Sequence, residues 1–145
     1  MAKIKPLRQS PVFKSLTDRE IALFSRIVSE EEYSPGTLLT ASNMKSENFY
    51  FIERGRITVS LGSADNHGDL VLGEGDTFGE WSLLTPGHLT SAWLKVSEPS
   101  NILRVDTVDF EKFAKEEPET ALKVLRALAA VIRRSVEEIK GILSG

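Results

Sequence analysis

The chain has 145 residues, a net charge of −3 at pH 7 and 27% charged residues, which is typical of one globular domain rather than two. It contains no cysteine, and this excludes disulfide frameworks, thiolate metal sites and cysteine nucleophiles. The basic pair Arg133-Arg134 is followed closely by Glu137 and Glu138, so we expect no binding of nucleic acid.

The order of residues disfavours membrane proteins, secreted proteins and enzymes. No stretch approaches the length of a membrane span, and the basic start of the chain, 1–6, lacks the apolar run of a secretory signal. We therefore expect a cytoplasmic protein without membrane contact. The only histidines, His67 and His88, have no second metal ligand at a useful spacing, and no serine or threonine has a recognisable nucleophile setting. We expect no metal site, no catalytic residue and no enzyme activity.

The first helix is predicted over about 17–28. Thr17 can act as its N-cap, Glu20 can complete a capping box, and Leu16 can pack against Ile21. The apolar residues then recur with the spacing of one buried helical face, at Ile21, Phe24, Ile27 and Val28.

From about 33 to 105 the pattern changes to short apolar or alternating runs, separated by turn-forming residues. Runs of strand length at such close spacing predict a mainly β fold with flanking helices, built as an antiparallel sandwich or jelly roll. We expect breaks between strands at Arg54-Gly55 and Glu98-Pro99-Ser100, among other places. The predicted strands are 37–39, 49–52, 57–61, 70–72, 91–96 and 102–105.

Helical periodicity returns over about 107–143, where Pro118 is suited to begin a second helix. At about 1.5 Å per residue the last helix would span roughly 37 Å, more than one small sandwich covers. We expect the surplus to form a homodimer; burial against the chain's own sandwich is the alternative. The apolar residues of this helix alternate intervals of three and four, the heptad pattern of a packed seam, at Leu122, Leu125, Ala129, Ile132, Val136, Ile139 and Leu143.

A candidate ligand site lies between residues 78 and 92. Gly79 lets backbone approach a ligand without a side-chain clash, and a helical turn behind it would aim free N–H groups at an anion. Glu80 is an acceptor suited to a sugar hydroxyl, and Ser91 is a donor suited to a phosphate oxygen. No arginine or lysine lies from Ile57 to Trp93. The predicted pocket residues are Phe78, Gly79, Glu80, Trp81, Ser82, Thr90, Ser91 and Ala92.

This site resembles the phosphate-binding cassette of cyclic nucleotide-binding domains, the family that includes the effector domain of the catabolite activator protein. The resemblance implies one jelly-roll domain over 1–145, cAMP or cGMP as the ligand, no other cofactor, and a regulatory signal passed to an unknown downstream protein. The matching segments are 75–80, 83–84 and 91–93 in the cassette, and 11–17, 35–36, 51–55 and 109–110 outside it, together with the long terminal helix.

By this resemblance Glu80 matches the family's ribose-binding glutamate, and Ser91 matches the hydroxyl residue that touches the phosphate. The family's phosphate-binding arginine would immediately precede Ser91, where this chain has Thr90. Loss of such a charge-assisted pair costs about 1.5–3 kcal/mol, or roughly one to two decades of affinity. We therefore expect weakened or altered nucleotide binding. A non-binding module for protein interaction or dimerisation, with the same fold, is the alternative.

Family members that regulate transcription carry a DNA-binding helix-turn-helix after the long helix. We find none before the last residue, Gly145, so we expect any output to pass through another protein, a dimer contact, or a segment outside these 145 residues.

Overall fold

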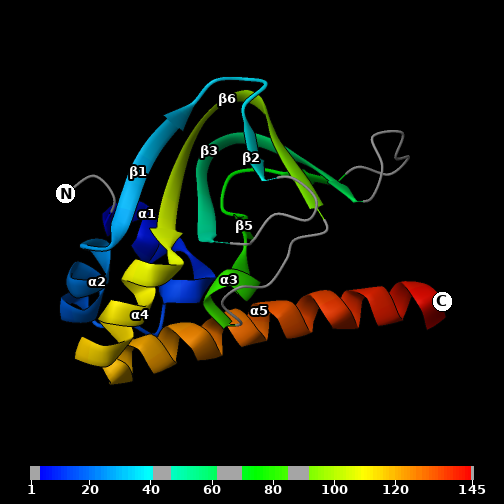
Figure 1. Ribbon diagram of the computed structural model, residues 1–145. Coiled ribbons are helices and arrows are strands. Elements are labelled where there is room, and N and C mark those ends of the chain that lie inside the picture. The colour runs from blue at the N-terminus through cyan, green and yellow to red at the C-terminus, as the bar shows by residue number, and fades with distance from the viewer. Residues whose placement is uncertain (1–3, 41–46, 62–69, 85–91, 145) are drawn as a thin grey trace.

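The computed structural model describes residues 4–40, 47–61, 70–84 and 92–144 (Figure 1). A roll of β-strands occupies one side of the molecule, helices gather at one end of the roll, and the long last helix runs beneath it. The elements are, in chain order, α1 Ile4–Gln9, η1 Pro11–Phe13, α2 Asp18–Ser25, β1 Val28–Tyr33, β2 Leu38–Thr40, β3 Asn48–Leu61, β4 Leu70–Leu72, β5 Thr77–Phe78, α3 Glu80–Leu84, β6 Ala92–Asp106, α4 Thr107–Glu116 and α5 Pro118–Ser144.

The described strands form one antiparallel sheet in the order β1-β6-β3-β4, with β2 also paired to β6 and β5 to β3. Strands β3 and β6 are its spine and pair along their whole length, from Asn48 opposite Asp106 to Leu61 opposite Ala92. This arrangement confirms the predicted antiparallel roll with flanking helices.

The predicted breaks at 54–55 and 98–100 are wrong, because β3 and β6 run through them as continuous strands. The pairing register shifts there instead, between Ile52 and Ile57, and the two strands bend together. Gly55 has φ +113°, and a Cβ on it would overlap the side chain of Ser100 on the neighbouring strand. Glycine is therefore required by a close strand approach, and not by a turn.

The predicted capping box of α2 is confirmed. The Thr17 hydroxyl accepts from the Glu20 amide at 3.2 Å, and the Glu20 carboxylate accepts from the Thr17 amide at 3.0 Å. The helix ends at Ser25, however, and not near Val28. Val28 instead begins β1, where it pairs with Val105. Its apolar side chain is buried in the same core as Ile21 and Phe24 of the helix, and this explains why the apolar spacing continued past the helix end.

Alternation along β3 divides the buried residues into two clusters. Phe49 and Phe51 belong to the cluster beneath the helices, while Tyr50 and Ile52 belong to the cluster inside the roll. The inner cluster is completed by Ile57, Val59, Leu94, Val96 and Ile102, with Tyr33, Leu39, Leu72 and Phe78 partly buried against it. Helix α1, which the apolar pattern did not predict, contributes the buried Leu7 to the cluster beneath the helices.

Helix α5 carries two apolar stripes rather than one. The stripe buried against the helix-side core contains Ala121, Val124 and Leu128, each at most 3% exposed, with Val131 partly buried beyond them. In the predicted seam, each of its first four residues follows a residue of this buried stripe by one position in the sequence. Its first member, Leu122, is 46% exposed and Ala129 is exposed, whereas Leu125 and Ile132 are partly buried.

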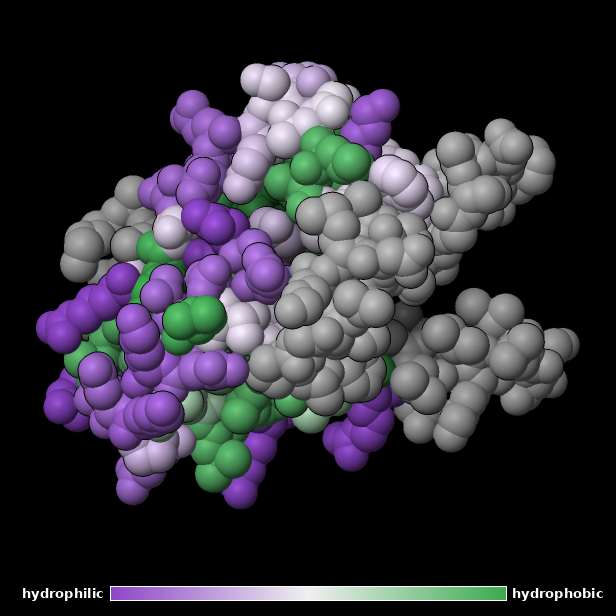
Figure 2. Space-filling view, viewed as in Figure 1, coloured by the Kyte–Doolittle hydropathy of each residue, from purple (hydrophilic) through white to green (hydrophobic). Residues whose placement is uncertain are grey.

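The surface of the described residues is mostly hydrophilic in the view of Figure 2, with apolar side chains in separate patches, one of them over β2. Leu38 of β2 is 48% exposed. None of the helices in the described part of the chain has the apolar length needed to cross a membrane.

Candidate functional site

The candidate site lies where β5 ends and α3 begins. Strand β5 is held on β3 by the pairs Tyr50–Phe78 and Phe51–Thr77. The turn before it is also fixed to β3, since the Gly75 amide donates to the Ile52 carbonyl at 2.8 Å and the Ile52 amide donates to the Asp76 carbonyl at 2.9 Å. The chain therefore enters α3 from a fixed position on the long strand.

Gly79 turns the chain from β5 into α3. It is buried and has φ +87°, a conformation that residues with a Cβ rarely adopt. A Cβ at this position would overlap the carbonyl oxygen of Asn48 and lie 3.3 Å from the Cα of Phe49. The close approach made possible by Gly79 is thus to the backbone of β3, and it sets the depth at which α3 sits on the roll.

Glu80 is the first residue of α3 and is partly buried. Its Oε1 accepts a hydrogen bond from Oγ1 of Thr77 at 2.6 Å. Charge-assisted O–H···O⁻ bonds have this length, so the hydroxyl holds one side of the carboxylate. An ionised carboxylate has two oxygens and about four acceptor positions, which leaves acceptor capacity for the hydroxyl groups of a ligand.

Ser82 stabilises the turn from within. Its side chain is fully buried, its Oγ donates to the Gly79 carbonyl at 2.6 Å, and its amide donates to the same carbonyl at 2.9 Å. Its own carbonyl accepts from Oγ1 of Thr107, the first residue of α4. Ser82 therefore stabilises the turn at Gly79 and connects it to α4.

The inner face of the roll beside the cassette is apolar. Phe78 and Leu72 pack against the inner cluster, and Leu70 pairs with the buried Val59. Directly opposite residues of antiparallel strands share one face, so Leu70 lies on the inner side, yet it remains 58% exposed. Strands β4 and β5 and helix α3 contain no arginine or lysine.

Four of the predicted site residues cannot be placed in full. Thr90 and Ser91 lie outside the described residues, as do the side chains of Trp81 and Ala92. The backbone of Trp81 belongs to α3, and that of Ala92 begins β6 opposite Leu61. Of the predicted pocket, the structure brings Phe78, Gly79, Glu80 and Ser82 together at one turn.

Sequence reasoning missed a polar network behind the cassette. Arg104 of β6 pairs with Tyr50, and its guanidinium donates to Glu31 at 3.0 Å and to Asn48 at 3.3 Å. Burial, reinforced by neighbouring Tyr33, raises the pKa of Tyr50 to about 12. Arg104 thus holds the side chain of Asn48, the residue whose carbonyl oxygen lies close to Gly79. The available signal was strand alternation, which places an arginine at 104 on the same face as the apolar Ile102.

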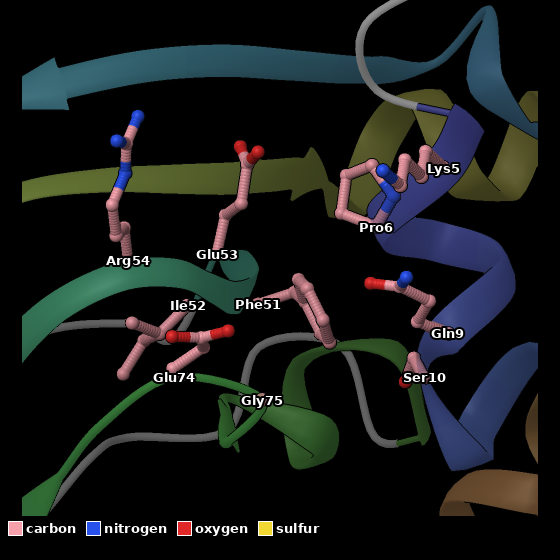
Figure 3. Close-up of a pocket in the computed structure, with 10 residues that line it drawn as sticks. All are labelled: Lys5, Pro6, Gln9, Ser10, Phe51, Ile52, Glu53, Arg54, Glu74 and Gly75. Atoms are coloured by element: carbon pink, nitrogen blue, oxygen red, sulfur yellow. The ribbon is translucent and has the colours of Figure 1, made fainter.

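A groove of about 490 Å³ lies apart from Glu80, between α1, β3 and the turn that follows β4 (Figure 3). Lys5 and Arg54 lie at opposite sides of the close-up, with Glu53 and Glu74 between them. This mixture of charges defines no single ligand class. Across the described ranges, no cluster of three or more histidine, aspartate or glutamate side chains is arranged to hold a metal ion.

The chain is similar in sequence to known proteins over most of its length. It is 28% identical over 128 residues to glutaminase 2 of Bradyrhizobium diazoefficiens, covering 88% of this chain and 20% of that protein. It is 26% identical over 111 residues to the cAMP-activated global transcriptional regulator of Pasteurella multocida, covering 75% of this chain and 53% of the regulator. The chain therefore spans about half or less of the length of these curated relatives.

The fold is similar to that of solved proteins. The structure of the Thermus thermophilus catabolite activator protein matches with a TM-score of 0.77 and 25% identity, covering 93% of this chain and 62% of that one. A family model described as the cyclic nucleotide-binding domain matches residues 30–117, a stretch that includes nearly all of the roll, the Glu80 turn and α4. On this match, the chain belongs to the cyclic nucleotide-binding domain family.

Proposed function

We propose that this chain is a regulatory, non-catalytic sensor module that binds a cyclic nucleotide, cAMP or cGMP, more weakly than a pocket with a phosphate-binding arginine would. The observation that carries the proposal is the Glu80 carboxylate, held by Thr77 at the start of α3. A carboxylate in this position is suited to accept from a ribose hydroxyl, in line with the family to which the chain belongs. We further propose that residues 1–145 act as one such domain in the cytoplasm.

The rest of the ligand would meet two different surfaces. The apolar inner face at Leu70, Leu72 and Phe78 is suited to the less polar parts of a nucleotide. The phosphate would depend on backbone amides and on the hydroxyl groups of Thr90 and Ser91, because no arginine or lysine occurs from Ile57 to Trp93. Neutral donors hold an anion less tightly than a guanidinium does, which is the reason for the weaker binding.

A response to the ligand would leave the cassette through Thr107. This residue begins α4 and donates to the Ser82 carbonyl in α3, so movement of α3 would act on α4 and then on α5. A ligand shifts such an equilibrium only by the difference in its affinity for the two arrangements. An unknown downstream protein would read the position of these helices.

Homodimerisation is the second part of the proposal. Leu122 and Ala129 of the predicted seam are exposed and lie outside the core, while Leu125 between them packs partly against it. The heptad pattern continues through Val136, Ile139 and Leu143, and a helix of 27 residues spans about 40 Å. The same helix of a second copy matches this spacing along its whole length, and it is the occupant that we propose.

Calorimetric titration with cAMP and cGMP tests the proposal directly. We expect at least one nucleotide to bind with Kd tighter than about 100 μM, equivalent to roughly −5.5 kcal/mol. Thr90→Arg is expected to tighten binding by about one to two decades, and Glu80→Ala to weaken it. Absence of saturable binding by folded protein at millimolar nucleotide would overturn the sensor function. It would favour the alternative that Thr90 already supports, a module for protein interaction that binds no nucleotide.

A further inference from the structure

We infer that Thr77 is a positioning residue for Glu80, and that its hydroxyl sets how tightly the site holds the sugar hydroxyl of a ligand. The inference rests on the proposed function, since it concerns the same site. It assigns a role to a side chain outside the set predicted from sequence, which began at Phe78.

The two side chains differ in how firmly their backbones are held. Thr77 lies in β5, and its backbone pairs with Phe51 in the long strand β3. Glu80 follows the buried turn at Gly79 and has three rotatable side-chain bonds, so its carboxylate has many positions available. The 2.6 Å bond from Thr77 to Glu80 therefore transfers the rigidity of the sheet to the carboxylate.

This contact is not needed to close the turn into α3. Two hydrogen bonds from Ser82, one from its amide and one from its hydroxyl, already reach the Gly79 carbonyl. The Thr77 hydroxyl donates to the side chain of Glu80 and leaves the backbone of the turn untouched. The Thr77 bond therefore orients the Glu80 carboxylate, and the turn does not depend on it for closure.

Because the Thr77 hydroxyl orders the Glu80 carboxylate before a ligand binds, we expect its removal to weaken ligand binding. A carboxylate that is already ordered loses less conformational entropy when a ligand hydroxyl binds to it. Oε1 accepts from Thr77, which leaves Oε2 and the remaining acceptor position of Oε1 available to a ligand hydroxyl. In a 3′,5′-cyclic nucleotide the 2′-hydroxyl is the free hydroxyl of the sugar, so it is the group through which Thr77 would influence binding.

The test compares Thr77→Val, which keeps the shape of threonine and removes the hydroxyl, with Thr77→Ser, which keeps the hydroxyl. Each protein is titrated calorimetrically with cAMP and with 2′-deoxy-cAMP, which lacks the group that Glu80 would accept from. We expect Thr77→Val to weaken cAMP binding about five- to thirtyfold, and to change 2′-deoxy-cAMP binding by less than about twofold. Thr77→Ser is expected to stay within about threefold of the unmodified protein for both nucleotides.

Equal weakening of both nucleotides by Thr77→Val would indicate a merely structural role and overturn the inference, as would no weakening of either. Thermal unfolding of each variant checks that it is folded. Thr77→Ala replaces Thr77→Val in the same comparison if the valine variant does not fold. The two proposals fail in different ways. If the unmodified protein binds neither cAMP nor cGMP, the proposed function fails and the inference fails with it; if it binds cGMP alone, the same comparison is made with cGMP and 2′-deoxy-cGMP. If it binds cAMP and Thr77→Val leaves the affinity for cAMP unchanged, only the inference fails.

Discussion

The hydroxyl of Thr107 lies 3.1 Å from the carbonyl oxygen of Ser82 and 3.0 Å from that of Glu47. Thr107 is the first residue of α4, Ser82 lies in the short helix α3, and Glu47 immediately precedes β3. One buried hydroxyl thus lies between the candidate ligand site, the long strand of the roll and the first of the two C-terminal helices. This hydroxyl connects the helix that follows the Glu80 turn directly to α4.

Replacing Thr107 by valine keeps the shape of the side chain and removes the hydroxyl donor that lies between two carbonyl oxygens. The Glu47 carbonyl still accepts from the amide of residue 107 at 2.9 Å, but the Ser82 carbonyl loses this donor. We expect the free energy of unfolding, measured by urea denaturation, to fall by about 1–3 kcal/mol. Thr37→Val is the matched control, because its hydroxyl also donates to a carbonyl, that of Ser34, but in an exposed turn. It should cost less than about 0.5 kcal/mol. Equal effects of the two substitutions would contradict the importance of the Thr107 contact.

Gly79→Ala is expected to destabilise the protein more than Gly75→Ala. Both glycines have positive φ, +87° and +88°, so both variants bear the conformational cost of about 1–2 kcal/mol. Only at Gly79 would the added Cβ also overlap the Asn48 carbonyl; at Gly75 it would meet nothing within 4 Å. We expect the collision to add about 1–3 kcal/mol, measured by chemical denaturation. Similar losses for both variants would show that Asn48 moves aside at little cost.

Glu20 gives the protein a pH-dependent contact between α2 and α5. Hydrogen bonds from Lys123 at 2.8 Å, from the Thr17 amide and from Thr120 lower the pKa of Glu20 from 4.5 to about 2. A carboxyl with a lowered pKa in the folded state contributes stability that is complete above the unfolded value and is lost as the pH falls through the folded value.

Glu20→Gln should therefore lower the free energy of unfolding by about 1–3 kcal/mol at pH 7, where charged hydrogen bonds are lost. The difference from the unmodified protein should narrow from pH 4.5 downward and disappear near pH 2, as followed by denaturation across this range. Glu119→Gln, an exposed position on α5, serves as the control and should change stability by less than about 0.5 kcal/mol. A difference in the free energy of unfolding that stays constant with pH would contradict the role assigned to the Glu20 carboxylate.

Neighbouring positions on α5 should separate assembly from folding. Leu122→Glu places a charge on the exposed stripe, and we expect it to dissociate the proposed homodimer while the monomer stays folded. Val124→Ala removes two methyl groups from a fully buried side chain and should cost about 2 kcal/mol without changing the oligomeric state directly. Sedimentation at micromolar concentration and thermal unfolding measure the two effects. A strictly monomeric unmodified protein would remove the dimer proposal.

The sequence predicted the fold class and the turn of the candidate site because both depend on local signals. Thr17 and Glu20 form a capping box within four residues, and Gly79-Glu80 forms a turn within two. Strand lengths could not be predicted in the same way. Gly55 and Ser100 resemble turn residues until their strands are placed side by side, where they permit a bend. Arg104 and Thr107 act on residues more than 20 positions away, and no local pattern reveals such partners.

The two stripes of α5 bear on how this domain can be reused in other chains. The stripe at Ala121, Val124 and Leu128 keeps the helix on the roll, while the stripe at Leu122 and Ala129 makes no part of that core. Substitutions at Leu122 and Ala129 should therefore change what this face of the helix can contact at little cost to the folding of the roll. A gene fusion that joins this domain to another protein would need to change only these outward positions of one helix to suit the new surroundings.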